Sequence, residues 1–323
     1  MPDVITTRKN GFAEMAYVGE KPWHGLGQKL EPGLSIDEWK TAAGMDWTAR
    51  RSRVRFGEGD NQRIFDEHHV IFRSDNKKPL GIVGQKFHLV QPGEILEFFR
   101  DLTNGNGYEL NTAGTLFDGR RFWALARVTD DAVVIGNDRV KSHLLLCTAI
   151  DGSMKTVGKF VAERVVCSNT LTIALKESQT TSFSISHRSE FDADDMKKQL
   201  GIATGAFREF MVQTRKLAAK PITTSEAEQF IGEALVENRV VSAKEVTDTA
   251  AFKKIRELFV DGTAMGAELA GVDGTLWGLL NGITEYVDHH AKGKTPSHQM
   301  DNALFGRGDA FKTAALQKAL ALV

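Results

Sequence analysis

Residues Lys141–Leu175, KSHLLLCTAIDGSMKTVGKFVAERVVCSNTLTIAL, decide the fold that we predict for this chain. The segment starts with an apolar strand, turns at Asp151-Gly152 and returns in a second strand. Asp-Gly between two β-rich runs predicts a hairpin because glycine supplies the positive φ that the turn needs. The run Leu144–Ile150 is apolar on both faces, which predicts a strand buried on both sides. After the second strand, Arg164–Leu171 is expected to lead into a helix.

The remainder of the first half is also rich in predicted strands. Tyr108–Val128 has the pattern of a second hairpin, turned at Asp118-Gly119, and Trp47–Phe56 has the pattern of a single strand. One helix is expected from Pro92, with apolar residues along one stripe. Residues 1 to about 35 are glycine-rich, and we expect them to be irregular.

The second half of the chain changes to helical spacing. A doubly wound sheet would alternate strands and helices throughout, and this chain does not. We therefore predict an α+β fold with an antiparallel, β-rich N-terminal half that contains one inserted helix, and a helical C-terminal half. Residues 1–175 would form the β-rich core domain with an irregular N-terminal segment, and residues 176–323 a helical region packed on it.

The composition argues against a globally electropositive protein. The 323 residues are 41% hydrophobic and carry a net charge of −1, with a pI near 6.8, so any basic surface must be local. Cys147 and Cys167 both lie in apolar, strand-like context, which fits packed thiols in a reducing compartment. The start of the chain lacks the pattern of a signal peptide, and no apolar run approaches the length of a membrane span. We expect a cytoplasmic protein that does not contact membranes.

The motifs of covalent chemistry are missing from the sequence. No GxxxxGK[ST] loop occurs, and Gly25-Leu-Gly27 lacks the strand–glycine–helix context of a dinucleotide site. His68 and His69 are adjacent, so in a strand they point to opposite faces, and His289-His290 has no Cys or His partner at ligand spacing. His24 is the most distinctive histidine, and either a turn or a functional role fits it. We expect a non-enzymatic protein with no metal and no cofactor.

Basic side chains recur on three predicted β elements. Arg51, Arg53 and Arg55 would project from one face of a strand, where they repel each other unless they meet water, carboxylates or phosphate. The other two elements combine cations with aromatic residues, as surfaces that bind single-stranded nucleic acid do. A solvated face remains the alternative for the three arginines, and Trp123 beside Arg120 and Arg121 fits plain core equally. The candidates for nucleic-acid contact are Arg51, Arg53, Arg55, Arg120, Arg121, Lys155, Lys159, Arg164 and Asn169.

Several short motifs occur in the order found in one family. They are Pro22–Gly27 (PWHGLG), Gly119–Arg121 (GRR), Asp151–Ser153 (DGS), Arg164–Leu171 (RVVCSNTL) and Trp277–Gly282 (WGLLNG). In these motifs the chain resembles a phage- and plasmid-borne family that is labelled as a domain of unknown function, or as phage/plasmid-like protein. Phe87-His88 departs from the family pattern, in which a tyrosine usually precedes Val-Gln. The resemblance implies a mobile-element origin and a cytoplasmic location, and it brings no established activity.

A weaker, fold-level resemblance links the chain to single-strand annealing recombination mediators. In those proteins a β-β-β-α unit carries DNA along a basic groove, and the subunits form rings or helical filaments. The resemblance implies a homo-oligomeric single-stranded DNA-binding and strand-annealing protein, with a phage exonuclease or a host protein as a further partner. In that picture Asn169 would start the helix of the unit and donate to phosphate.

The alternative function is an accessory protein of a mobile element that acts by protein–protein contact, for example against host defence. Its partner surface would be an apolar stripe in the helical half, although such a stripe more often belongs to an intramolecular core. That stripe consists of Leu276, Trp277, Leu279, Leu280 and Ile283.

Overall fold

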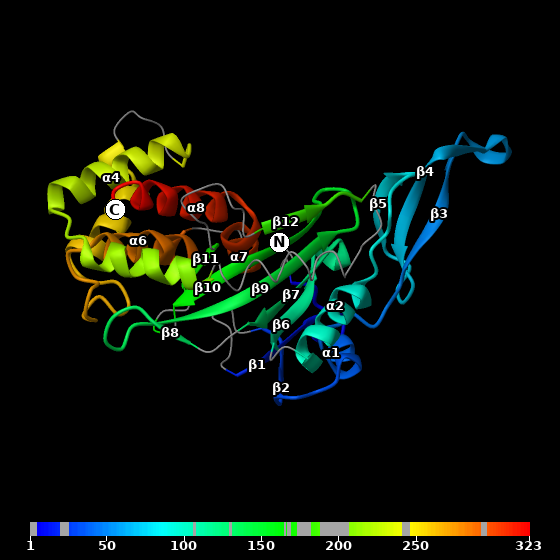
Figure 1. The fold of residues 1–323 in the computed structure, drawn as a ribbon. Coiled ribbons are helices and arrows are strands. Elements are labelled where there is room, and N and C mark those ends of the chain that lie inside the picture. Colours follow the sequence, from blue (N-terminus) through cyan, green and yellow to red (C-terminus); the bar gives the residue numbers. More distant parts are fainter. Residues whose placement is uncertain are drawn as a thin grey trace.

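The fold is α+β, as predicted, with antiparallel sheets in the first half and most of the helices in the second (Figure 1). The computed structural model describes residues 5–19, 26–105, 108–128, 131–164, 166, 169–172, 182–187, 207–240, 246–291 and 296–323. No helix within these ranges is long and apolar enough to cross a membrane.

The larger sheet has nine strands among the described residues, in the order β11-β10-β9-β7-β6-β1-β2, with β12 also paired to β10 and β8 to β9. Its long central strands are β6 (Glu109–Leu116), β7 (Arg121–Arg127), β9 (Arg139–Ala149) and β10 (Thr156–Arg164). The shorter strands are β1 (Met15–Val18), β2 (Gln28–Leu30), β8 (Ala132–Val133), β11 (Asn169–Thr172) and β12 (Ser182–Ile185). Both predicted hairpins are confirmed: Gly152 has a φ of 80° between β9 and β10, and Asp118 has a φ of 62° between β6 and β7.

Two sequence-based expectations need correction. The N-terminal segment is not irregular throughout, because β1 pairs antiparallel with β6 and parallel with β2. Strands β1 and β2 are four and three residues long, which is too short for a clear alternation of polar and apolar residues. Asn169 begins β11, which pairs with the end of β10, and does not begin a helix. The predicted division at residue 175 stays a prediction, and β12 lies beyond it.

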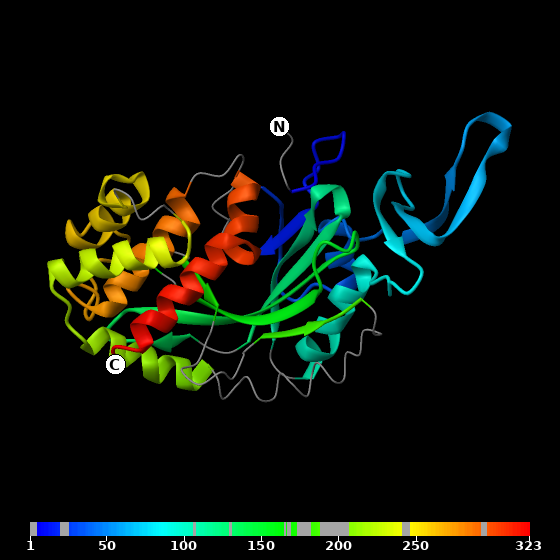
Figure 2. The same ribbon diagram turned by 90° about the horizontal axis from the view of Figure 1, so that it is seen from above.

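The second sheet has three strands, β3 (Ala49–Phe56), β4 (Arg63–Arg73) and β5 (Pro79–Gly84), in the order β3-β4-β5. Strand β5 pairs with residues 68–72 of β4, so beyond His68 the β3–β4 hairpin is a two-stranded ribbon. This ribbon, residues Arg53–His68, is called the arm below; its turn contains the short helix η1 (Gly59–Asn61). Figures 1 and 2 show that the arm projects away from the body, at the end opposite the C-terminal helices.

The helices lie in two groups. Helices α1 (Ile36–Ala42) and α2 (Pro92–Gly105) lie near the base of the arm, and a capping box of Ser35 and Glu38 starts α1. The C-terminal group comprises a helix over residues 207–219, α4 (Thr224–Glu237), α5 (Ala250–Val260), α6 (Leu276–Glu285), α7 (Pro296–Phe305) and α8 (Arg307–Leu320). Three short helical turns complete the described fold: η2 (Phe117–Gly119), η3 (Val246–Asp248) and η4 (Tyr286–His290).

The predicted apolar stripe of the helical half belongs to the core. Leu276, Trp277, Leu279, Leu280 and Ile283, all on α6, are each at most 3% exposed. They form one cluster with the large sheet and with the other helices. The intramolecular interpretation is therefore confirmed, and this stripe does not provide a surface for a partner.

Candidate nucleic-acid interface

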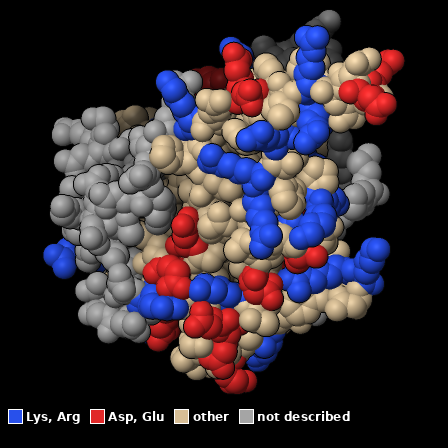
Figure 3. Space-filling model, turned by 90° about the vertical axis from the view of Figure 1, so that its right-hand side faces the viewer, with Lys and Arg blue, Asp and Glu red and all other residues tan. Residues whose placement is uncertain are grey.

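Exposed cations from three β elements lie at the end of the molecule where the arm projects. Five of the nine predicted contact residues are exposed, namely Arg51, Arg53, Arg55, Arg120 and Lys155. We call this set the basic end. Figure 3 views the molecule from this side and shows lysine and arginine side chains gathered over it, with acidic side chains between them.

The turns of the two large hairpins bring these elements together. The backbone N–H of Ile150 donates to the carbonyl of Arg120 at 2.8 Å, which fixes the β9–β10 turn beside the β6–β7 turn. Asp151 approaches β5 so closely that a side chain at Gly81 would meet it at 2.8 Å. On the same face of the three-stranded sheet, the guanidinium of Arg51 donates to the carbonyl of Phe87. The three basic elements therefore meet around β5, although they are far apart in the sequence.

Strand β3 supplies an arginine face. The strand is continuous from Ala49 to Phe56, so Arg51, Arg53 and Arg55 project to the same side. The sequence analysis did not select Arg63, which is exposed on β4 opposite Phe56. The position of Arg63 on the arm depends on the register between β3 and β4. This register shifts between Arg53 and Val54, and no sequence pattern predicts the shift.

Lys159 is buried and does not belong to the exposed surface. Its ammonium donates to Asp309 at 2.7 Å and to the carbonyl of Leu304 at 2.5 Å. Burial lowers the pKa of Lys159, and the charge of Asp309 opposes that shift. The side chain therefore joins β10 to helices α7 and α8, an internal role that the sequence pattern did not predict.

Arg164 is also internal, with only 2% of its side chain exposed. Its Nε donates to Asp138 at 2.8 Å, and its two other nitrogens donate to the carbonyls of Met265 and Gly266 at 3.0 Å. Trp277 donates from Nε1 to the second oxygen of Asp138 at 2.8 Å. Arg164 and Asp138 thus connect the large sheet to the helical half.

Arg121 contacts α7. Its guanidinium forms an ion pair with Asp301 and lies over the rings of Phe117 and Phe305, at 5.2 and 5.9 Å from their centroids. Burial raises the pKa of Asp301, and the charge of Arg121 opposes this. Arg121 is only partly accessible. Asn169, the last candidate, lies in β11, and its side chain is outside the described part of the structure.

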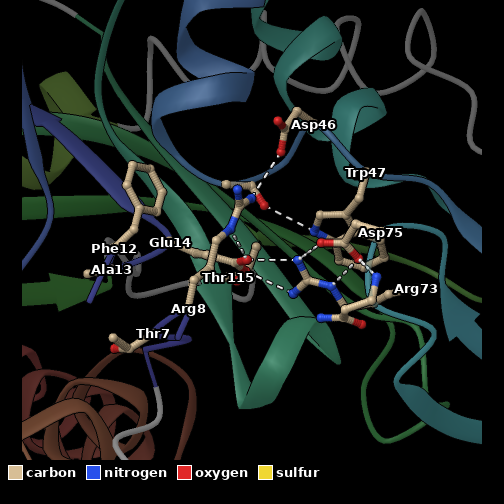
Figure 4. A network of polar contacts seen from close by, with 12 residues as sticks. Thr7, Arg8, Phe12, Ala13, Glu14, Asp46, Trp47, Arg73, Asp75 and Thr115 are labelled. Carbon is tan, nitrogen blue, oxygen red and sulfur yellow. Dashed lines mark hydrogen bonds and ion pairs between the residues drawn. The ribbon is translucent and has the colours of Figure 1, made fainter. Parts of the chain in front are cut away.

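A buried ionic network anchors the base of the arm (Figure 4). Arg73, at the end of β4, donates to both carboxylate oxygens of Glu14 at 2.7 and 2.9 Å, and both side chains are 1% exposed. Arg73 also pairs with Asp75 at 2.8 Å and lies over the ring of Trp47 at 4.3 Å. Burial disfavours the charged guanidinium, but its hydrogen bonds to Glu14 and Asp75 outweigh burial and raise the pKa of Arg73. The network therefore fixes the start of β3 and the end of β4 against the N-terminal segment.

Two further titratable groups, Cys147 and His143, are buried in the large sheet. No cluster of three potential metal ligands occurs among the described residues. Burial raises the pKa of the Cys147 thiol, which opposes thiolate formation. Burial lowers the pKa of His143 to about 3, with Lys141 and Arg127 acting in the same direction. Its Nε2 lies 3.5 Å from Glu163, too long for a strong ion pair, so we take His143 as neutral.

The larger part of the chain matches the model of one protein family. Residues 79–310 match the family model described as Domain of unknown function (DUF932), which is more than half of the chain. The chain belongs to this family. The DUF932 match begins at Pro79, the first residue of β5, so strands β3 and β4 with the arm lie before it. No curated protein and no solved structure matches the chain.

Proposed function

We propose that this DUF932 protein binds single-stranded DNA at the basic end and anneals complementary strands, without covalent chemistry, in phage or plasmid recombination. One observation carries the proposal: exposed cations from three β elements, including the arginine face of β3, lie together at one end. Side chains that attract phosphate at several successive positions suit a polyanion better than a single small anion.

Annealing requires that the protein hold the backbone while the bases stay free to pair. Arg120 and Lys155 would contact phosphates at the body, and the β3 arginines would continue the path along the arm. Neutralising about five phosphates of a single strand releases their counterions, so log K should fall with log salt concentration with a slope of about −3 to −4. The near-neutral net charge of the chain does not oppose this, because the relevant field is local.

Fluorescence anisotropy with a labelled oligonucleotide, measured at two salt concentrations, tests the proposal. The variant Arg53→Ala/Arg55→Ala removes two exposed charges from the arm. We expect Kd to rise at least tenfold and the salt slope to shrink by about 1.4, since each lost phosphate contact contributes about 0.7. The control Arg208→Ala/Lys216→Ala removes two exposed charges from the helix over residues 207–219 and should leave both quantities unchanged.

Annealing is followed separately, by fluorescence quenching between two complementary labelled strands. The wild type should accelerate pairing, and the arm variant should lose the acceleration in proportion to its lost binding. If micromolar wild-type protein does not bind single strands at low salt, the proposed function is wrong. Equal losses in the arm variant and in the control would also contradict it.

A further inference from the structure

The three-stranded sheet has an apolar face that no described residue covers. Cross-strand pairs place Val54 opposite Phe65 and Val70 opposite Ile82, and alternation puts Phe56 on the same side as Val54. The rings of Phe56 and Phe65 lie edge to face at 6.5 Å, which confirms that they share this side. We call these five residues the apolar face.

The two faces of this sheet differ in what they contact. On the arginine side, Ile71 and Val83 are 0% and 5% exposed, so the base of the sheet is packed against the body. On the apolar face, Phe56, Phe65 and Ile82 are 55%, 40% and 60% exposed. His68 stacks on Phe65 at 5.0 Å and extends the aromatic surface. A contiguous exposed group of aromatic and aliphatic side chains on a projecting element is typical of a protein-binding surface.

We propose that the apolar face binds the same face of a second copy of this chain, with the two arms running in opposite directions. The charges along the arm support this occupant. The carboxylates Glu58 and Asp60 lie in the turn, whereas Arg50, which alternation places on the same side as Val54, lies at the base of β3, and all three side chains are exposed. Antiparallel apposition therefore sets the acidic tip of each arm near the basic base of the other, as a two-fold, self-complementary interface requires.

The distal arm carries exposed charges of both signs. It has the cations Arg53, Arg55 and Arg63 and four carboxylates, and all seven side chains are exposed. The carboxylates are Glu58, Asp60, Asp66 and Glu67. A second copy can bring cations to these carboxylates, which nucleic acid cannot. The arginine face of β3 points to the other side of the ribbon and stays free in the pair, so the inference stands independently of the proposed DNA binding.

Sedimentation velocity at protein concentrations from about 1 to 100 µM tests the pairing, since an interface of this small size is expected to be weak. We expect the wild type to form dimers within this range and Phe56→Ser/Phe65→Ser to dissociate at least tenfold more readily. Ile64→Ser is the matched control, because Ile64 is 38% exposed on the opposite face of the same ribbon. The control should sediment as the wild type does, and thermal unfolding should show that all three proteins are folded.

Cross-linking gives a second readout. In a Cys167→Ser background, Val54→Cys, which lies near the expected two-fold axis, should form disulfide-linked dimers under mild oxidation, whereas Ile64→Cys and the background protein, whose Cys147 is buried, should not. The inference is overturned if the wild type stays monomeric at 100 µM, or if both engineered cysteines cross-link equally. It is also overturned if Phe56→Ser/Phe65→Ser weakens binding to a short oligonucleotide without changing sedimentation, because the face would then bind bases.

Discussion

Replacing Arg73 with methionine should destabilise the protein strongly, although Arg73 lies outside every proposed contact surface. Methionine fills much of the same volume but leaves the buried carboxylate of Glu14 without its main partner. Arg73 donates two hydrogen bonds to Glu14, and both side chains are 1% exposed. An ionised group in such a site is costly when it is unpaired, because the protein interior solvates it poorly.

The structure sets the size of the expected loss. Breaking a buried ion pair by removing one partner costs about 3–5 kcal/mol. Glu14 keeps two partners after the change, Arg8 at 2.8 Å and the hydroxyl of Thr115 at 2.5 Å, so the low end applies. We expect Arg73→Met to lower the free energy of unfolding by about 3 kcal/mol. Glu14→Gln should cost less, about 2 kcal/mol, because Arg73 retains Asp75 and the carbonyl of Asp118.

Urea denaturation of the wild type, the two single variants and the double variant measures these quantities. The double variant removes both charges and should cost about 3 kcal/mol, less than the sum of the single losses, which leaves a coupling of about 2 kcal/mol. If Arg73→Met costs less than about 1 kcal/mol, or if the two losses simply add, the network does not anchor the arm in the way that we describe.

Three further predictions follow from the burial of individual groups. Lys155→Ala should weaken DNA binding without changing stability, whereas Lys159→Ala should lower the urea midpoint because β10 then loses its buried contacts with Asp309 and with the carbonyl of Leu304. Burial lowers the pKa of His143 to about 3. Between pH ~6.5 and that value, the imidazole is therefore protonated in the unfolded chain and neutral in the folded one. The free energy of unfolding should therefore fall as the pH drops from ~6.5 towards 4, and fall less in His143→Gln, as denaturation at several pH values would show. Cys147, whose pKa burial raises, should resist iodoacetamide until the protein unfolds, which peptide mass spectrometry can measure.

The hairpins were predictable because their signals are local. Asp151-Gly152 and Asp118-Gly119 fix turns through backbone preferences that act within four residues, and β3 was recognisable from its own alternation. Strands β1 and β2 were missed because their formation depends on β6, which lies about 80 to 100 residues further along the chain. Their short sequences carry no comparable local signal.

The candidate site was predictable only as a set of cations. Sequence spacing shows that Lys155 and Lys159 belong to one hairpin, yet one is exposed and the other is buried against Asp309. That difference depends on where α7 and α8 lie, which is a matter of tertiary packing and not of strand periodicity. Arg164 was likewise selected for its place at the end of a strand, and its partner Asp138 is 26 residues away.

The distinction between internal and exposed cations decides how mutational data on this protein should be interpreted. Loss of DNA binding in an Arg164 variant would carry no information about phosphate contact. The same change takes the ion-pair partner from the buried Asp138 carboxylate, which keeps only the hydrogen bond from Trp277 that we describe, and disturbs the junction with the helical half. Loss of binding in an Arg53 variant would be informative, since that side chain is exposed and its removal is expected to leave the fold intact. A reduced salt slope that accompanies the Arg53 change would then identify a phosphate contact, because destabilisation alone lowers the active fraction without changing the number of counterions released.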